Sequence, residues 1–211
     1  MKIDWVTVGP FQENSYVIVD EASRRAVLVD PGEEAARIIA MVQDAGATPE
    51  AIWLTHAHLD HVGAVEAIKR AWKVPVHLHA TDLPILRMAT ESAAKYGLTM
   101  EQPADPDRTL ADGDVMHVGA LRFTVRHTPG HAPGHVVFLG EGVMIGGDLL
   151  FAGSIGRTDL ALSNPDDMDK SLALIATFDH DTVVYPGHGP PTTIGNELAS
   201  NPFLADAVTS T

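Results

Sequence analysis

The segment Thr55-His56-Ala57-His58-Leu59-Asp60-His61 gathers an unusual number of metal-binding side chains. It places three imidazoles and one carboxylate within residues 56–61, directly after the apolar run 51–54. An apolar run of this kind is typical of the end of a buried strand. Residues i and i+2 of an extended chain point the same way, so His56 and His58 can bind one ion together. We predict a helix over 62–71, reached through a turn that carries Asp60 and His61 toward a second ion.

Neutral imidazole and carboxylate are ligands that suit zinc, iron and manganese. The alternative interpretation of residues 55–61 is a polar loop whose histidines cap a helix. Three histidines in six positions beside an aspartate favour a metal site over that alternative.

Three later segments supply side chains of the same kind. Each follows a run with strand character, and each lies among glycines or prolines that predict a sharp turn. The side chains are His131, Asp148 and His188, after the runs 121–126, 142–145 and 182–185. Several strands that end in such loops at one rim would bring these distant residues together.

The order His-x-His-x-Asp-His, then His131, Asp148 and His188, resembles the metallo-β-lactamase superfamily of metal-dependent hydrolases. The resemblance extends from the segment 29–32 to the segment 186–190. It implies an αββα sandwich, with two mixed β-sheets packed face to face and helices outside each sheet. Periodicity alone indicates only a mixed α and β chain, which we expect to form a single domain over residues 1–211.

Within this superfamily, the segments 147–159 and 187–194 resemble the glyoxalase II-like branch, the hydroxyacylglutathione hydrolases. The short bacterial type is most similar, because full-length enzymes carry a longer C-terminal helical region. The resemblance implies hydrolysis of a thioester, such as S-lactoylglutathione or a related hydroxyacylglutathione, by a hydroxide that bridges two metals. A persulfide dioxygenase with a single iron is the alternative, because it shares much of the run Gly156-Arg157-Thr158-Asp159. A lactonase or phosphodiesterase of the same fold, and a metal-binding domain without activity, are further alternatives.

The resemblance also implies roles for individual residues. The first metal would be held by His56, His58 and His131, and the second by Asp60, His61 and His188. Asp148 would bridge both metals, so Asp60 and Asp148 are the expected catalytic carboxylates. Two divalent ions are expected, with zinc first and iron or manganese as alternatives.

Three further residues have both a functional and a structural interpretation. Asp30 lies at a strand end, where it either orients a metal-bound histidine or forms a turn before Pro31. Arg157 either binds an anionic group of the substrate or pairs with Asp159. Ser154 either lines the substrate pocket or is solvated. His77 and His79 also lie two residues apart, but no Asp-His pair adjoins them, so we expect them to pack rather than bind metal.

Composition excludes several kinds of protein. The chain has no cysteine, which rules out disulfides, thiol catalysis and thiolate ligands. Lysine and arginine total 14 against 28 acidic residues, a net charge of −14, so we expect no nucleic-acid partner. No apolar run reaches the roughly 18 residues that span a bilayer, and no signal peptide is visible. We therefore expect a cytoplasmic protein without a membrane partner, and the resemblance implies a small-molecule thioester as its substrate.

Helices are also predicted over 33–45, over 81–96 with Thr81 as N-cap, and over 166–178 with Asn164 as N-cap. The segment 98–108, with its prolines and charges, is expected to be a loop that borders the active site.

Overall fold

The computed structural model describes residues 1–209, and most of its strands form two six-stranded sheets. The first sheet has the order β1 (Lys2–Val8), β2 (Glu13–Asp20), β3 (Arg25–Val29), β4 (Thr48–Trp53), β5 (Val76–His79) and β6 (Arg108–Leu110). The second has the order β14 (Thr192–Thr193), β13 (Val183–Pro186), β10 (Val143–Gly147), β9 (Val136–Gly140), β8 (Leu121–His127) and β7 (Val115–Val118). A small hairpin joins β11 (Leu150–Phe151) and β12 (Ser154–Ile155).

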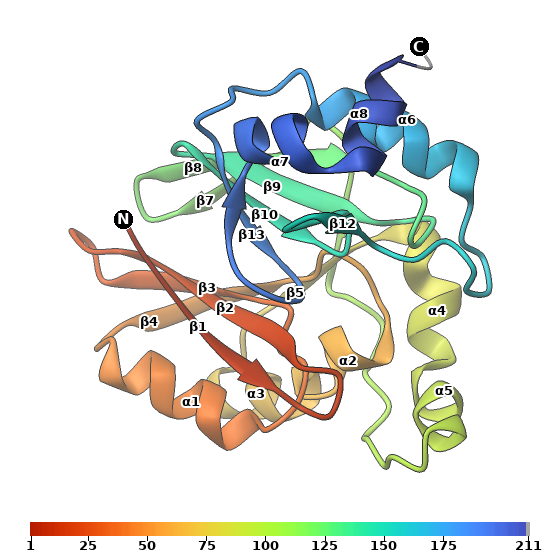
Figure 1. Cartoon of the computed structure of the whole chain (residues 1–211). Coiled ribbons are helices and arrows are strands. Elements are labelled where there is room, and N and C mark those ends of the chain that lie inside the picture. Colours follow the sequence, from red (N-terminus) through yellow and green to blue (C-terminus); the bar gives the residue numbers. More distant parts are fainter. Residues whose placement is uncertain (210–211) are drawn as a thin grey trace.

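Helices cover the outer face of each sheet (Figure 1). The first sheet is covered by α1 (Ala35–Asp44) and α3 (Val65–Trp72), and the second by α6 (Pro165–Ile175), α7 (Ile194–Ser200) and α8 (Pro202–Thr209). The remaining helices are α2 (Leu59–Val62), α4 (Leu83–Arg87) and α5 (Ala89–Lys95), with a 3₁₀ turn at Ala80–Asp82. This arrangement confirms the predicted αββα sandwich. Within residues 1–209, no helix is long and apolar enough to cross a bilayer.

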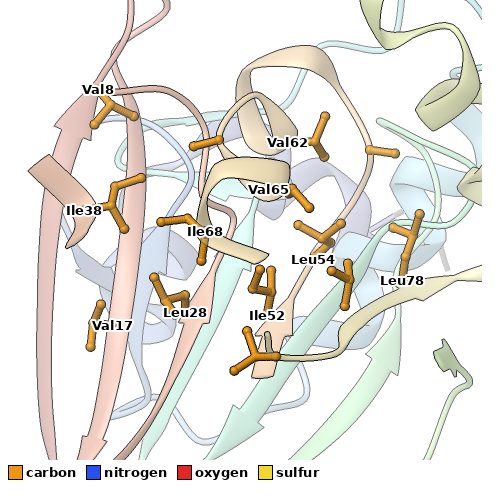
Figure 2. Packing of buried hydrophobic residues seen from close by; sticks show 14 of the residues in the cluster. Val8, Val17, Leu28, Ile38, Ile52, Leu54, Val62, Val65, Ile68 and Leu78 are labelled. Carbon is orange, nitrogen blue, oxygen red and sulfur yellow. The ribbon is translucent and has the colours of Figure 1, made fainter. Parts of the chain in front are cut away.

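Strand β2 shows how the sequence produces the layers, because all of its residues are buried. Successive side chains point to opposite faces of a strand. Val17 and Val19 pack toward the helices, whereas Tyr16 and Ile18 pack toward the second sheet. Figure 2 shows Val17 within the helix-facing cluster, which also contains residues of α1 and α3.

The core between the sheets anchors the strand that leads to the histidine-rich segment. Trp53, the last residue of β4, is almost completely buried. Its ring lies 5.8 Å from Phe123 and 5.0 Å from Phe138, measured between ring centroids. Aromatic pairs at such distances contribute beyond their buried area. The backbone that enters residues 55–61 is therefore held by both sheets.

Parallel pairing explains why the predicted ligands gather at one edge. Strands β3, β4 and β5 run parallel to one another, so their carboxyl ends meet at the same edge of the first sheet. Strands β10 and β13 are also parallel, with Ile145 opposite Tyr185. Asp30 and His56 follow the first group, and Asp148 and His188 follow the second.

Two of the predicted helices differ from the observed ones. The helix expected over 62–71 is divided into α2 and α3, so that Asp60 and His61 lie within a helical turn. The helix expected over 81–96 is divided into a 3₁₀ turn, α4 and α5. Thr81 does not cap it, because its hydroxyl contacts His79 Nδ1 at 2.7 Å.

The helix predicted over 166–178 is observed as α6, which begins one residue earlier and ends at Ile175. The predicted cap is confirmed: the side chain of Asn164 accepts hydrogen bonds from the backbone N–H groups of Asp166 and Asp167, at 3.0 and 3.3 Å. Such caps contribute about 1 kcal/mol by satisfying free amide groups at the helix start.

Candidate metal centre

The structure brings six of the seven predicted ligands together in two adjacent clusters, and places the seventh, Asp148, between them. The first contains His56, His58 and His131, and the second contains Asp60, His61 and His188. Within each cluster, the potential ligand atoms lie within 4.8 Å of one another. Both clusters stand at the edge where the two sheets meet.

Asp148 lies between the clusters and faces both. Its Oδ1 lies 3.4 Å from His61 Nε2, in the second cluster. Its Oδ2 lies 3.4 Å from His131 Nε2 in the first cluster and 3.4 Å from His188 Nε2 in the second. The two oxygens of one carboxylate can serve two cations, so this geometry suits the bridging role expected of Asp148.

Local backbone structure sets the direction of each side chain in the histidine-rich segment. His58, which precedes α2, has an extended backbone with φ −64° and ψ 152°. The rings of His56 and His58 lie 4.8 Å apart, measured between centroids, and His58 Nδ1 is 2.8 Å from His131 Nε2. The single turn of α2 then directs Asp60 and His61 toward His188, whose Nε2 lies 3.4 Å from Asp60 Oδ2.

Glycine is required beside the centre. A Cβ atom at Gly187 would collide with Asp148 Oδ1 and approach His61 Cε1. The backbone before His188 can therefore approach the bridging carboxylate only because residue 187 lacks a side chain.

The first cluster consists of neutral imidazoles. Burial lowers the pKa of His56 well below its ordinary value of 6.5, and lowers that of His58 to about 3. Burial also lowers the pKa of His131. Neutral imidazole is the form that coordinates a metal, because its free nitrogen keeps a lone pair.

The second cluster concentrates negative charge. Burial lowers the pKa of His188, but hydrogen bonds to Asp148 and Asp60 outweigh this effect and raise it to about 10. Burial likewise lowers the pKa of His61, yet the charges of Asp148 and Asp60 raise it well above 6.5. The carboxylates thus favour positive charge at this place, which a divalent cation supplies.

Unsatisfied atoms show that the residues fit metal ions. Among the described residues, the buried atoms His56 Nε2, His61 Nε2 and Asp148 Oδ1 have no hydrogen-bond partner. Buried polar atoms in folded proteins are nearly always paired, because an unpaired one costs about 1–3 kcal/mol. Coordination satisfies all three atoms at once, and the set of nitrogen and carboxylate donors suits zinc, iron or manganese.

A second layer of contacts orients the histidines. In four of them the Nδ1 atom is occupied, which leaves Nε2 facing the clusters. These contacts are His56 Nδ1 to Thr55 Oγ1 at 3.0 Å, His61 Nδ1 to Asp30 Oδ2 at 3.0 Å, His131 Nδ1 to the Arg157 carbonyl at 2.8 Å and His188 Nδ1 to the Gln12 carbonyl at 3.3 Å.

Asp30 stands where it was expected, directly behind a candidate ligand. Besides His61, its oxygens accept from the Thr55 amide at 2.7 Å and the Thr55 hydroxyl at 2.6 Å. Its backbone has φ 47°, a left-handed conformation that is unfavourable for a residue with a side chain. Asp30 also forms a group with His56 and His61 whose potential ligand atoms lie within 4.8 Å of one another. Both of its carboxylate oxygens already contact Thr55 or His61, which favours a supporting role over coordination.

The sequence interpretation missed two residues that hold the loops of the centre. The Asn14 side chain donates to the carbonyls of Pro186 at 3.2 Å and Gly189 at 2.8 Å, on either side of His188. Asp82 accepts from the amides of Ala57 at 2.8 Å and Gly134 at 2.5 Å. It thereby joins the two loops that carry the first cluster.

A signal for Asn14 was present in the sequence, because Glu13-Asn14-Ser15 is a polar run directly before the apolar residues 16–19. The structure buries all three residues. Asp82 gives no such signal, because it lies 25 residues from Ala57 and 52 from Gly134. Its role depends on tertiary contacts that spacing does not show.

The other histidines near the centre make different contacts. His135 Nε2 accepts from the Asp148 amide at 3.0 Å, so His135 supports the bridging residue from behind. His79 stacks on His127 with ring centroids 4.3 Å apart. Among the described residues, neither His77 nor His79 belongs to a group that could hold a metal.

A pocket of about 440 Å³ opens over both clusters. Arg157 and Ser154, the two residues predicted to bind substrate, are among its lining residues. Arg157 also pairs with Asp159, through contacts of 2.6 and 2.8 Å, as its structural interpretation expected, and its role toward a substrate stays a prediction. The segment 98–108 is a loop up to the start of β6, as predicted, but none of its residues is among the described residues that line this pocket, and α4 and α5 supply that wall instead.

Comparison with known proteins supports the interpretation of these residues as a metal centre. A model of the metallo-β-lactamase superfamily matches residues 8–188. The probable metallo-hydrolase YqgX of Bacillus subtilis is 36% identical, over 97% of this chain and 98% of its own. The hydroxyacylglutathione hydrolase GloC of Haemophilus influenzae is 34% identical, again over 97% of this chain and 98% of its own.

Solved structures show a similar fold. TTHA1623 in a di-iron-bound form has a TM-score of 0.88 and 44% identity, with 95% of this chain and 99% of that chain covered. The B3 metallo-β-lactamase BLEG-1 has a TM-score of 0.90 and 38% identity, with 96% and 99% covered. ETHE1 from Myxococcus xanthus has a TM-score of 0.82 and 28% identity, with 98% and 85% covered.

The chain belongs to the metallo-β-lactamase superfamily. It is a metal-dependent hydrolase of the metallo-β-lactamase fold, with the two histidine and aspartate clusters as its candidate metal centre.

Proposed function

We propose that this protein hydrolyses a thioester of an anionic thiol, such as a hydroxyacylglutathione, with two divalent metal ions. The observation that carries the proposal is the pair of clusters that share Asp148 at the base of a pocket. The likeness to the hydroxyacylglutathione hydrolase GloC, along nearly the whole chain, supports the thioester over other substrates.

Each cluster would bind one of the two cations. His56, His58 and His131 would hold one cation, while Asp60, His61 and His188 would hold the other, with Asp148 shared. When bound, two such cations lower the pKa of water toward about 7 and polarise a carbonyl oxygen. Asp30 and Thr55 fix the orientation of His61 and His56, so the ligand set is arranged before substrate arrives.

The ionisation of the carboxylates in the pocket is compatible with hydrolysis of a thioester. Among the described residues that line it, Asp60 and Asp148 are the only carboxylic acids. Neighbouring histidines hold the pKa of both below the ordinary value of 3.8, despite burial that raises it, so neither is a proton donor at neutral pH. His188 also lines the pocket and has a raised pKa, but it would lose its proton on binding a cation, because a metal-bound imidazole is neutral. A thiolate departs without protonation, whereas an amine or a simple alkoxide requires a general acid.

Arg157 and Ser154 are the proposed substrate contacts. The Arg157 carbonyl accepts from His131, so the arginine side chain starts beside the first cluster. Its guanidinium is the group that would bind a carboxylate of the thiol. Ser154 lies in β12 on the same wall, where its exposed side chain would contact the substrate.

Persulfide dioxygenation by one iron is the second candidate, and the likeness to ETHE1 favours including it in the test. The likeness to BLEG-1 adds β-lactams to the substrates to be tried.

The deciding experiment offers thioesters, persulfides, lactones, phosphodiesters and β-lactams to protein of measured metal content. We expect thioesters to be the best substrates and the metal content to be about two per chain. Oxygen consumption with a persulfide, at one iron per chain, would replace the proposal by the dioxygenase.

A further inference from the structure

The pocket wall beyond the two clusters is largely hydrocarbon. The side chains that carry the argument are Phe11, Ile85, Met88, Ala89, Ile155 and Leu160. They come from separate parts of the chain: the loop before β2, the helices α4 and α5, and the segment that includes β12. An apolar wall of this extent beside a hydrolytic centre favours a substrate that buries hydrocarbon against it.

The apolar side chains of this wall differ in how deeply they are buried. Ile85 and Ala89 are only 7% and 1% exposed, so they form the inner part of the wall. Met88, between α4 and α5, remains 40% exposed and offers apolar surface for a ligand to cover. At the outer end of α5, the Tyr96 ring meets Phe11 edge-on, with centroids 5.1 Å apart.

Positive charge lies at the mouth of the pocket. Apart from the candidate ligands, Lys95 and Arg157 are the charged residues among the described lining residues. Their side chains are 67% and 59% exposed, and each has an acidic partner, Glu91 and Asp159. Neither Glu91 nor Asp159 is among the lining residues, so the charged side chains that a ligand meets at this mouth are two cations, in a chain of net charge −14. This positive charge favours an anionic group at the solvent side.

We propose that the pocket selects thioesters whose acyl group is apolar and whose thiol is anionic, with Lys95 as a second residue that binds the thiol. This inference rests on the proposed thioester hydrolysis. The scissile carbonyl must lie at the clusters, and the anionic thiol extends to Lys95 and Arg157 at the exposed mouth. The inner wall of Ile85, Met88 and Ala89 is then left for the acyl group.

The test is a ladder of glutathione thioesters on the metal-loaded protein: acetyl, propionyl, butyryl and hexanoyl, with lactoyl beside propionyl. Lactoyl differs from propionyl only by a hydroxyl, so this pair isolates the polarity of the acyl group. Each kcat/KM is divided by the rate of hydroxide-catalysed hydrolysis of the same thioester. We expect a rise of about four-fold per methylene, which corresponds to about 0.8 kcal/mol for each buried CH₂. Propionyl should exceed lactoyl, because the wall leaves the hydroxyl unpaired.

Two matched variants assign the effect to the wall. Met88→Ser should flatten the ladder, so that the ratio of kcat/KM for the hexanoyl thioester to kcat/KM for the acetyl thioester falls. Val115→Ser is the control, because Val115 has a similar exposure of 38% but lies in β7, outside the pocket. It should keep the ladder of the unaltered protein. For the mouth, Lys95→Gln should raise KM for glutathione thioesters and leave an uncharged thioester unaffected.

The outcomes separate this inference from the proposed function. Hydrolysis of all the thioesters with a flat ladder, or with lactoyl ahead of propionyl, would overturn the apolar acyl site and leave thioester hydrolysis intact. If no thioester is hydrolysed, the proposed function fails. Calorimetric binding of S-alkyl glutathione thioethers then tests the wall separately: affinity that rises with chain length supports it, and constant affinity overturns it.

Discussion

At the level of single residues, Asp148 is the side chain that both clusters share. It is 6% exposed, and its oxygens face His61 on one side and His131 on the other at equal distances of 3.4 Å. Its loss would remove one donor from each proposed site. Asp60, by contrast, lies beside His61 and His188 and belongs to the second cluster alone.

The two aspartates should therefore differ in their effect on metal content. We expect protein purified without chelator to carry about two ions per chain by elemental analysis. Asp148→Ala should lower the occupancy of both sites, whereas Asp60→Ala should mainly empty the second. His77→Ala is the matched control and should change neither metal content nor turnover. Equal losses in the His77 and Asp148 variants would contradict the division between ligand and packing residues.

Arg157 combines a structural pair with a position on the pocket wall, so its kinetics decide between the two roles. If it binds the thiol, Arg157→Ala should raise KM for S-lactoylglutathione about ten-fold with less effect on kcat, the result of losing a uniform binding contact. An uncharged thioester should be unaffected. The control is Arg70→Ala, because Arg70 is 60% exposed and also forms an ion pair, but lies on α3 outside the pocket.

A structural role for Arg157 would give a different result. Its pair with Asp159 would then be what matters, and Asp159→Asn should reproduce the loss. Both substrates would lose activity equally, and the anionic site would have to be sought at Lys95.

At the level of secondary structure, separate contacts hold the loops of the two clusters. Asp82, at the end of a 3₁₀ turn, links the loop of His56 and His58 to the loop of His131. Asn14, in β2, bonds the carbonyls on both sides of His188. Each would act on metal binding through a backbone that it fixes, without contacting the ion.

These loop contacts predict a crossed pattern of zinc affinities. In a His188→Ala background, where only the first cluster is complete, Asp82→Asn should weaken zinc binding about ten-fold or more. In a His58→Ala background, Asn14→Ala should have the larger effect and Asp82→Asn little. The measurement is competition with a chromophoric chelator at equilibrium. Equal weakening by either variant in both backgrounds would show general destabilisation instead.

The sequence predicted the start of a helix correctly where a contact between neighbouring residues determines it. The Asn164 cap of α6 depends on residues two and three positions away, and sequence spacing found it. The helix expected over 81–96 is divided into a 3₁₀ turn, α4 and α5, and its predicted cap was wrong because the Thr81 hydroxyl contacts His79. The break between α2 and α3 lies where the Ala64 amide bonds the distant Pro31 carbonyl, a contact that periodicity does not describe.

For the chain as a whole, the αββα layers were implied by the resemblance to the metallo-β-lactamase superfamily, because periodicity indicated only a mixed α and β chain. The structure adds the reason why the predicted ligands gather: parallel strands bring their carboxyl ends to one edge. The pocket wall was not predicted, because α4 and α5 reach it through tertiary packing. The loop 98–108 was chosen for its polarity, yet the wall is hydrocarbon. Asn14 and Asp82 were missed for the same reason: their partners are distant in sequence.

Removal of metal should destabilise the whole fold. The second cluster would keep closely spaced carboxylates in a chain that already carries a net charge of −14. A ligand at about 1,000 times its Kd stabilises the folded state by about 4 kcal/mol. For a chain of this length, chelation should therefore lower Tm by about 10 °C in calorimetry. A His58→Ala, His188→Ala double variant is the control, and its Tm should not respond to chelator.

The most direct measurement is a titration of metal-free protein with zinc, iron or manganese while release of thiol from a glutathione thioester is followed. We expect hydrolysis to be absent in the metal-free protein and to rise until about two equivalents are bound. Activity that is complete at one equivalent of iron and requires oxygen, or two bound ions without any thioester hydrolysis, would contradict the dinuclear thioester hydrolase.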